Sequence, residues 1–372
     1  MEKRLIENLG IETSLLGFGC MRLPQKDGKI DRDYAFEMID KAYKAGVNYF
    51  DTAYPYHNGE SELVTGAALD RYPRDSYYLA TKLPVWFVKS KEDAKKYFEE
   101  QLQKLHKDYI DFYLLHAIGA ERFREMRDLG VIDYLEEEKK AGRIKYLGFS
   151  FHDGFEAFKE IITYKKWDFC QIQFNYMDKN EQATLEGVKL AKELGVPLII
   201  MEPVKGGSLS NLPDDVTTEF KRLRPDASIT SWALRYCGSF DIVKVILSGM
   251  TEDYQLEDNL KTFNNFEPLS DEEMAAVNVT SDAINRRVFN GCTGCRYCMP
   301  CPNGVDIPRN FRIWNTYGMY QNTGHAKWEW GQISLEEKAK NCLECGLCME
   351  HCPQGISIPE DLAKVQETMD NL

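Results

Sequence analysis

The sequence predicts a (β/α)8 barrel followed by a smaller, mainly helical domain that is rich in cysteine. Over residues 1–265, eight short apolar segments alternate with amphipathic ones, and eight strands alternating with helices in about 250 residues are typical of this barrel. An open doubly wound sheet is the alternative, but the first apolar segment lacks the Gly-rich turn and following helix that this fold uses. Eight of the eleven cysteines lie within residues 292–352. We therefore divide the chain into domains 1–265 and 266–372.

The predicted elements of the barrel follow from their apolar patterns. Short apolar runs predict strands at 15–19, 48–53, 77–83, 110–117, 144–151, 169–175, 197–202 and 242–249. Apolar residues at helical spacing predict helices at 33–45, 61–69, 91–105, 134–140, 182–194 and 228–237. Gly46, Gly142 and Gly195 follow three of these helices, where glycine readily ends a helix. Two long connections, 118–132 and 202–225, follow the fourth and seventh strands and are expected on the catalytic face of the barrel.

The overall composition argues against two classes of function. The net charge of −13, from 46 basic and 59 acidic residues, argues against a nucleic-acid surface. No apolar run approaches the ~20 residues that span a bilayer, and the N-terminus lacks the apolar stretch of a signal peptide. We therefore expect a cytoplasmic protein with no membrane or nucleic-acid partner, in which cysteines serve as metal ligands rather than disulfides. Three isolated cysteines are expected to be ordinary core thiols: Cys20, Cys170 and Cys237.

The other eight cysteines form two runs: Cys292, Cys295, Cys298 and Cys301, then Cys342, Cys345, Cys348 and Cys352. The second run has the spacing C-x2-C-x2-C-x3-C-P of bacterial ferredoxins, in which three thiolates hold one [4Fe–4S] cluster and the fourth binds the other cluster. Zinc is the alternative, but it uses four ligands in two C-x2-C pairs. We therefore predict two [4Fe–4S] clusters. In the crossed pairing Cys352 completes the first set and Cys301 the second; the shorter last gap of the first run leaves an uncrossed pairing open, and all eight are ligands in either case.

A sequence repeat organises the second domain. Residues 301–311 and 352–362 share the pattern Cys-Pro-x-Gly-x-x-Ile-Pro, in which Pro308 and Pro359 suit the first turn of a following helix. A further helix is predicted at 271–287. The 40 residues between the two runs are long for a compact β-type ferredoxin, so the domain resembles the helical ferredoxins fused to many redox enzymes. Its aromatic side chains are expected to form the core around the clusters: Trp314, Tyr317, Tyr320, Trp328 and Trp330.

Four ionisable side chains fall near the carboxyl ends of three consecutive predicted strands of the barrel. Asp51 lies near the end of the second predicted strand, Lys82 near that of the third and His116 near that of the fourth, and Tyr56 lies in the loop after Asp51. Barrel active sites lie at this end of the strands. One such residue would be uninformative, but the combination of Asp, Tyr, Lys and His is specific and indicates a catalytic site.

Together these four groups can donate a proton to a carbonyl oxygen. A tyrosine with a pKa of about 10 donates poorly near neutral pH, but a nearby ammonium group stabilises the phenolate and is expected to lower that pKa. Lys82 can provide this charge to Tyr56, and an ion pair with Asp51 would fix its position. His116 can hydrogen-bond the substrate oxygen and orient it.

In order and in strand position, these four residues match the tetrad of the aldo-keto reductases, and residues 1–265 resemble that family. Further matching motifs are Leu16-Gly-Phe-Gly, Asp51-Thr-Ala, Gly59-Glu-Ser-Glu, Gly148-Phe-Ser and Gln171-Ile-Gln-Phe-Asn. The resemblance implies reduction of a small carbonyl compound, or oxidation of the alcohol, by hydride transfer with NAD(P)H, with Tyr56 as the proton donor. The whole chain resembles an aldo-keto reductase fused to a ferredoxin.

The same resemblance implies where the nicotinamide cofactor binds. The positions matched to its contacts are Ser150, Gln171, Met201, Val204, Gly206, Gly207, Leu209, Gly249, Gln255 and Asn259. Ser150 and Gln171 stand where the carboxamide is bound, Phe151 where asparagine is common, and Met201 where an aromatic residue often stacks on the ring. The backbone amides of residues 204–209 are placed to bind the pyrophosphate, and their glycines permit its close approach.

NADH is the favoured nucleotide. NADP-dependent members of the family bind the 2′-phosphate with basic residues, whereas residues 248–259 contain four acidic residues and neither lysine nor arginine. A dianionic phosphate placed there would meet like charge. Lys205 or another remote base could compensate, so NADP(H) stays open.

The two domains differ in the number of electrons that they transfer at a time, since a hydride carries two electrons and each cluster carries one. A flavin could connect the two modes, but the sequence has no specific flavin signature. We expect a NAD(P)H-dependent oxidoreductase whose clusters exchange electrons with a protein partner or with the substrate pocket. Two alternatives stay open: the clusters, not nicotinamide, feed electrons to a substrate or flavin in the barrel, or the chain is a non-catalytic scaffold with structural clusters.

Overall fold

The computed structural model describes residues 1–372, and contacts between residues divide them into two compact units. Unit 1 comprises Met1–Lys205 and Ser231–Ser270, and unit 2 comprises Gly206–Thr230 and Asp271–Leu372. Residues 206–225 of the second long connection are thus assigned by their contacts to unit 2, together with residues 226–230. The division at residue 265 stays a prediction.

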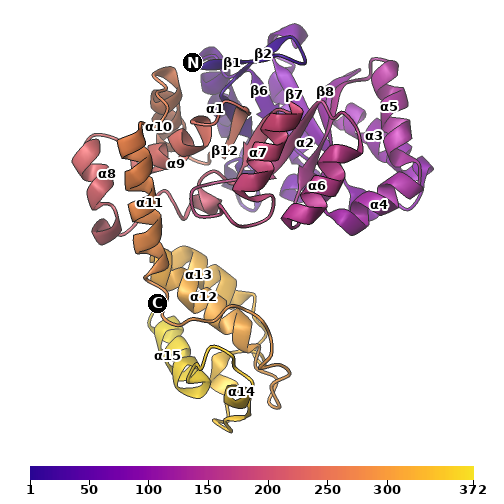
Figure 1. Cartoon of the computed structure of the whole chain (residues 1–372). Coiled ribbons are helices and arrows are strands. Elements are labelled where there is room, and N and C mark those ends of the chain that lie inside the picture. The colour runs from indigo at the N-terminus through magenta and orange to yellow at the C-terminus, as the bar shows by residue number, and fades with distance from the viewer. The chain divides into compact units, whose positions relative to one another are not determined.

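Unit 1 contains a closed barrel of eight parallel strands, as the sequence predicts (Figure 1). The strands are β3 (Leu16–Gly19), β6 (Tyr49–Asp51), β7 (Tyr78–Leu83), β8 (Ile110–Ile118), β9 (Ile144–Phe151), β10 (Phe169–Gln173), β11 (Leu198–Met201) and β12 (Val243–Gly249). Each strand pairs with the next along the chain, and β12 closes the barrel on β3. Asp51 pairs in register with Ala80 of β7, and Lys82 pairs with Leu114 of β8, so the ends of three consecutive strands lie together.

The helices of this part of the chain follow the strands. They are α1 (Arg32–Lys44), α2 (Ser61–Leu69), α3 (Lys91–Leu105), α4 (Ala120–Asp128), α5 (Val131–Lys140), α6 (Phe155–Tyr164), α7 (Thr184–Leu194), α9 (Ile229–Gly238) and α10 (Asp253–Asn264). Two hairpins precede α1: β1 (Lys3–Ile6) with β2 (Ile11–Ser14), and β4 (Gln25–Lys26) with β5 (Lys29–Ile30). Gly195 ends α7 in the left-handed conformation, as predicted, with φ of 66°.

The expectation that residues 118–132 form a long loop was wrong. This segment forms α4 and the beginning of α5. Six of its fifteen residues are charged. Phe123 and Met126, however, lie one turn apart and are both buried, which gives α4 an apolar face. No helix of the chain combines the length and the apolar character needed to cross a membrane.

Unit 2 is mainly helical. Its helices are α8 (Thr218–Leu223), α11 (Asp271–Asn285), α12 (Ile307–Tyr320), α13 (Thr323–Gly331), α14 (Leu347–Glu350) and α15 (Ile358–Asn371). Pro308 and Pro359 lie in the first turns of α12 and α15, as the repeat predicts. Helices α12, α13 and α15 pack on one another (Figure 1), around a core that includes Phe311, Trp314 and Leu362.

The aromatic residues of unit 2 do not all belong to this core. Trp314 and Tyr320 are buried, and Tyr317 and Trp330 pack against the core from its edge. Trp328, in contrast, is 62% exposed, so the expectation that it packs around the clusters was wrong. Its ring stacks on the ring of His325 one turn earlier on α13.

Candidate functional site

Three of the four predicted catalytic residues lie on barrel strands and the fourth lies in a tight turn. Asp51 is the last residue of β6, Lys82 the last but one of β7, and His116 lies near the end of β8. Tyr56 begins a short 3-10 turn in which His57 and Asn58 adopt left-handed backbone angles. This turn reverses the chain immediately before α2, so that Tyr56 is directed back to the ends of the strands.

The structure brings these side chains together around Lys82. The Lys82 ammonium donates to Asp51 Oδ1 at 2.6 Å, to the Thr52 carbonyl at 2.8 Å and to the Tyr56 hydroxyl oxygen at 3.4 Å. The rings of Tyr56 and His116 are 6.0 Å apart and nearly perpendicular. Lys82 is fully buried and Asp51 is almost so, which makes their charges dependent on one another.

The electrostatics of the pair keep Lys82 charged. Burial opposes the ammonium form, but the charge of Asp51 and the interactions with Tyr56 outweigh it and raise the pKa of Lys82 above its ordinary value. Burial also raises the pKa of Asp51, although Lys82 acts against this shift. The second carboxylate oxygen of Asp51 is buried without a hydrogen-bond partner.

The expected lowering of the pKa of Tyr56 is not what the structure gives. Burial raises this pKa, and the charge and hydrogen bond of Lys82 reduce the rise without reversing it. Tyr56 therefore keeps its proton at neutral pH. The pKa of His116 lies well below its ordinary value because of burial and of the charge on Lys82, so its imidazole is neutral there. The Nδ1 atom of His116 is buried and has no hydrogen-bond partner.

Behind Lys82 lies a buried polar network that the sequence analysis missed. Gln101 of α3 donates to Glu62 Oε1 at 2.6 Å and lies 3.0 Å from the carbonyl oxygen of Lys82, and the Tyr113 hydroxyl donates to Gln101 at 2.6 Å. Thr81 donates to the same Glu62 oxygen at 2.7 Å. All of these side chains are fully buried. The only sequence signal was the Gly-Glu-Ser-Glu motif that contains Glu62, since nothing marks Gln101 on an amphipathic helix.

Replacing Gln101 with leucine should destabilise the barrel and misplace Lys82. The change removes partners from Glu62, Tyr113 and the Lys82 carbonyl. Each unpaired buried group costs about 1–3 kcal/mol, so for these three groups we expect a loss of at least about 3 kcal/mol. Urea unfolding followed by tyrosine and tryptophan fluorescence measures it. Gln103→Leu is the matched control, because Gln103 is exposed on the same helix and should change stability little. Equal losses in the two variants would contradict the proposed role of the network.

The residues matched to the nicotinamide carboxamide lie side by side on β9 and β10. Ser150 pairs in register with Gln171, and both are buried. Ser150 Oγ accepts from the backbone N–H of Ala117 at 2.7 Å, and Gln171 Nε2 lies 3.6 Å from the sulfur of Met201. Gln171 Oε1 is buried and unpartnered, which leaves an acceptor that fits an amide N–H. The neighbouring Phe151 is buried and offers no polar contact.

The predicted pyrophosphate segment crosses the division between the units. Val204 belongs to unit 1, whereas Gly206, Gly207 and Leu209 belong to unit 2. Gly206 and Gly207 have φ of 62° and 92°, which glycine adopts without strain. Leu209 is buried. The role of this segment stays a prediction.

Lys205, the base that could compensate for the acidic residues 248–259, is already paired with a carboxylate. Its ammonium forms an ion pair with Asp178, a carboxylate that is almost fully buried. Gln173 and Asn175 also donate to Asp178, at 2.8 and 2.7 Å. Because Lys205 neutralises a buried carboxylate, it is a poor candidate for binding a 2′-phosphate.

The last three positions matched to the cofactor, Gly249, Gln255 and Asn259, lie at the end of β12 and on α10. Gln255 accepts from the backbone N–H groups of Thr251 and Glu252 at 2.7 and 3.1 Å and so caps α10. Asn259 is buried and donates to Ser248 Oγ at 2.9 Å. Gly249 is exposed, and the aliphatic part of Arg22 packs against it, 3.1 Å from the position a Cβ would occupy. Arg22, which lies far from residues 248–259 in the sequence, thus brings a cation next to this segment.

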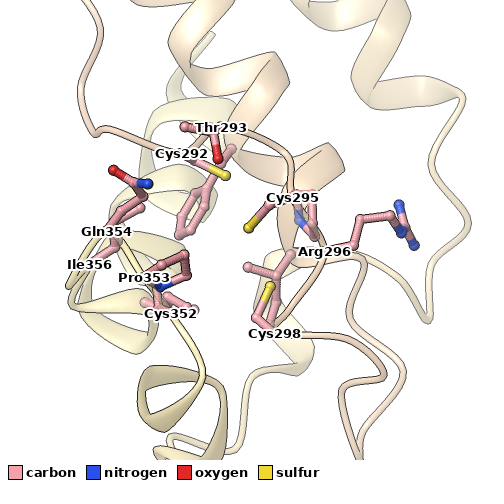
Figure 2. Close-up of a pocket in the computed structure, with 13 residues that line it drawn as sticks. Cys292, Thr293, Cys295, Arg296, Cys298, Cys352, Pro353, Gln354 and Ile356 are labelled. Carbon is pink, nitrogen blue, oxygen red and sulfur yellow. The ribbon is translucent and has the colours of Figure 1, made fainter.

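In unit 2, the four thiols of the first predicted set surround one cavity. Cys292, Cys295, Cys298 and Cys352 line it, together with apolar residues such as Phe311 and Ile358 (Figure 2). The sulfur atoms of Cys292, Cys295 and Cys298 face the same space, and Cys352 borders it (Figure 2). Burial raises the pKa of the Cys292 thiol, and the nearby thiols of Cys295 and Cys352 raise it further. Cys352 thus lies with the first run, as in the crossed pairing.

The second predicted set lines a neighbouring cavity. Its thiols are those of Cys301, Cys342, Cys345 and Cys348. Burial raises the pKa of the Cys348 thiol, and so do its neighbouring thiols, Cys342, Cys345 and Cys301. Cys298 and Ile307 line both cavities, so the two sets are adjacent.

The two cavities fit iron–sulfur clusters better than single ions. No three His, Cys, Asp or Glu side chains of the chain are gathered as ligands of one metal ion. The first cavity instead brings four thiols to the border of one space. Four thiolates that surround one space are the donor set that a [4Fe–4S] cluster requires. The role of each cysteine as a ligand stays a prediction.

Comparison with known proteins identifies both parts of the chain. Residues 15–281 match the model of the Aldo/keto reductase family, and residues 291–356 match that of the 4Fe-4S dicluster domain. Uncharacterized oxidoreductase YqkF of Bacillus subtilis is 27% identical over 307 residues, which are 74% of this chain and 95% of that protein. L-galactose dehydrogenase of Arabidopsis thaliana is 26% identical over 72% of this chain and 90% of its own length.

Two further comparisons bear on the barrel. NADH-specific methylglyoxal reductase of Escherichia coli is 27% identical over 222 residues, covering 55% of this chain and 66% of that protein. Among solved structures, the aldo-keto reductase AKR11C1 from Bacillus halodurans in its holo form superposes with a TM-score of 0.63 and 29% identity, over 75% of this chain and 96% of that one.

Proposed function

Since this chain belongs to the aldo/keto reductase family, we propose that it reduces a small aldehyde or ketone, or oxidises the corresponding alcohol, with Tyr56 as the proton donor. The observation that carries the proposal is the buried Lys82 ammonium, held by Asp51 at 2.6 Å and directed at the Tyr56 hydroxyl. A scaffold with structural clusters has no use for this costly arrangement.

Each residue has a separate task in the proposed reaction. Nicotinamide, when bound, supplies the hydride. Tyr56 transfers its proton to the substrate oxygen, and Lys82 stabilises the phenolate that remains. Neutral His116 donates a hydrogen bond to the same oxygen and orients it. Asp51 keeps Lys82 in place. In the reverse direction, the Tyr56 phenolate accepts the proton of the alcohol.

We propose that Gln171 and Ser150 hold the carboxamide and that the substrate lies against an aromatic wall. The unpartnered Gln171 Oε1 fits the carboxamide NH2 group. Trp86 lies 4.9 Å from the His116 ring, and Phe87 follows it with half of its surface exposed. Such a wall suits small carbonyl compounds, and the E. coli relative named for methylglyoxal reduction supports this substrate class.

NADH should be used at least about ten times more efficiently than NADPH, a difference of about 1.4 kcal/mol. The reason is that residues 248–259 are acidic and that Lys205 is committed to Asp178. Steady-state kcat/KM for the two nucleotides with one carbonyl substrate measures the preference. Asp253→Asn should improve the use of NADPH and leave NADH unchanged, because it removes one negative charge and frees Lys41, the ion-pair partner of Asp253. A preference for NADPH that disappears in Arg22→Gln would overturn the proposal and assign the 2′-phosphate to Arg22.

The two clusters are proposed as one-electron carriers, for which their adjacent cavities are suited. One observation favours a second function, in which electrons reach the barrel from the clusters without nicotinamide. Ser150 Oγ already accepts from Ala117, and Gln171 Nε2 is directed at Met201. Anaerobic titration separates the two functions: turnover driven by NADH supports the first, and turnover driven only by dithionite supports the second.

A further inference from the structure

We propose that the surface around the second cluster cavity is the docking site for a one-electron carrier protein with a basic surface. We call this surface the apolar rim; it consists of Tyr297, Leu343, Leu347 and Met349. The inference rests on the proposed role of the clusters as electron carriers and adds where electrons leave or enter the chain, and what kind of partner exchanges them.

The apolar rim is unusually exposed. Tyr297 and Leu343 are 68% and 69% exposed, and Leu347 and Met349 are 50% and 46% exposed. The first three also line the cavity of the second set. Large apolar side chains gathered at the edge of a cofactor cavity mark an interaction surface rather than an ordinary one.

The first cavity differs in this respect. Its exposed edge carries Thr293, Arg296 and Gln354, which are polar. Both cavities bring one exposed cysteine to the surface, Cys295 for the first and Cys345 for the second. Only the second combines an exposed ligand with an apolar surface that a partner protein can cover. Because the two cavities share Cys298, an electron delivered to either set has a short path to the other.

The charges around the apolar rim indicate the chemistry of the partner. Residues 341–360 contain three glutamates and neither lysine nor arginine. Glu344 and Glu350 are exposed next to the rim residues, whereas the cation beside Tyr297, Arg296, forms an ion pair with Asp306 at 3.6 Å. The chain as a whole has a net charge of −13. An acidic border steers a basic partner into place and disfavours an acidic one. A basic electron carrier is therefore the occupant that fits.

The experiment uses the full-length protein with both clusters, reduced with dithionite under anaerobic conditions. Stopped-flow absorbance follows its reoxidation by cytochrome c, a basic one-electron carrier protein, and by hexacyanoferrate(III), a small acceptor that needs no docking surface. The double variant Leu343→Gln/Leu347→Gln should lower the rate with cytochrome c at least fivefold and leave the rate with hexacyanoferrate(III) unchanged. The double variant Glu344→Gln/Glu350→Gln should lower the rate of reoxidation by cytochrome c and weaken the dependence of this rate on salt concentration. Iron content confirms that each variant keeps its clusters.

The matched control is Thr293→Ala/Gln354→Ala, at the edge of the first cavity. An unchanged rate with cytochrome c in both rim variants, or an equal loss in this control, overturns the docking site. A dimer of the wild-type chain that dissociates in Leu343→Gln/Leu347→Gln overturns it as well, since a second copy then covers the rim. If dithionite does not bleach the wild-type absorbance, the cluster assignment itself fails, and the docking proposal fails with it.

Discussion

Replacing Tyr56 with phenylalanine is expected to lower kcat for carbonyl reduction by about 10³-fold, within the range that a general acid contributes. The hydroxyl is the only group that the structure places both within hydrogen-bond distance of buried Lys82 and beside His116. Phenylalanine keeps the ring and its packing, so binding of NADH should be unchanged. Steady-state kinetics and fluorescence titration with NADH measure the two effects separately.

Tyr54→Phe is the matched control for this variant. The Tyr54 hydroxyl donates to Glu100 at 3.0 Å and takes no part in the contacts of Lys82. We therefore expect kcat within about twofold of the wild type in this variant. Its stability should fall by only about 1 kcal/mol, because the change removes one half-buried hydrogen bond. Undiminished turnover in Tyr56→Phe would remove the tyrosine from the mechanism and favour electron delivery from the clusters.

The pH dependence of kcat tests the same assignment. Burial raises the pKa of Tyr56, so the donor stays protonated through neutral pH and activity should fall only above the ordinary tyrosine value of about 10. The pKa of His116 lies well below its ordinary value, so no acidic limb is expected near pH 6.5. A loss of carbonyl reduction centred between pH 6 and 8 would show that another group controls the proton.

The barrel could be predicted because short stretches of sequence determine its strands. Apolar runs marked all eight strands, and the ionisable residues at their ends marked Asp51, Lys82 and His116. The direction of the pKa shift of Tyr56 was not predictable, because it depends on how much of the ring the fold buries against how close Lys82 lies. Gln101 was missed for a similar reason: its four contacts come from α2, β7 and β8, which only the fold brings together.

The second unit shows the same limit. The repeated Cys-Pro pattern predicted two helices with Pro308 and Pro359 in their first turns, and both helices are present. The exposure of Trp328 could not be predicted from the sequence, because an aromatic residue in a helix can face either the core or solvent. The ion pair of Lys205 could not be predicted either, because its partner Asp178 lies 27 residues away in the sequence.

Removing cysteines in pairs should reveal which of them share a cluster. In the crossed pairing, Cys292→Ala/Cys352→Ala removes two ligands from one set and leaves the other set complete, so about four of eight iron atoms should remain as one intact [4Fe–4S] cluster. Cys342→Ala/Cys352→Ala takes one ligand from each set, and no intact [4Fe–4S] cluster should remain. The uncrossed pairing predicts the opposite result for each variant.

Iron and acid-labile sulfide, counted on anaerobically purified protein, measure the outcome. Cys237→Ala is the control, because this thiol is buried in the barrel part of the chain.

The cavity lined by Cys292, Cys295, Cys298 and Cys352 is the physical reason for expecting the crossed result. The repeat places each Cys-Pro directly before a helix that packs in the shared core, and α12 and α15 contact one another. The fourth cysteine of each run is thereby carried away from its own loop and toward the other set. An intact cluster that survives in Cys342→Ala/Cys352→Ala would show that this packing does not determine the ligands.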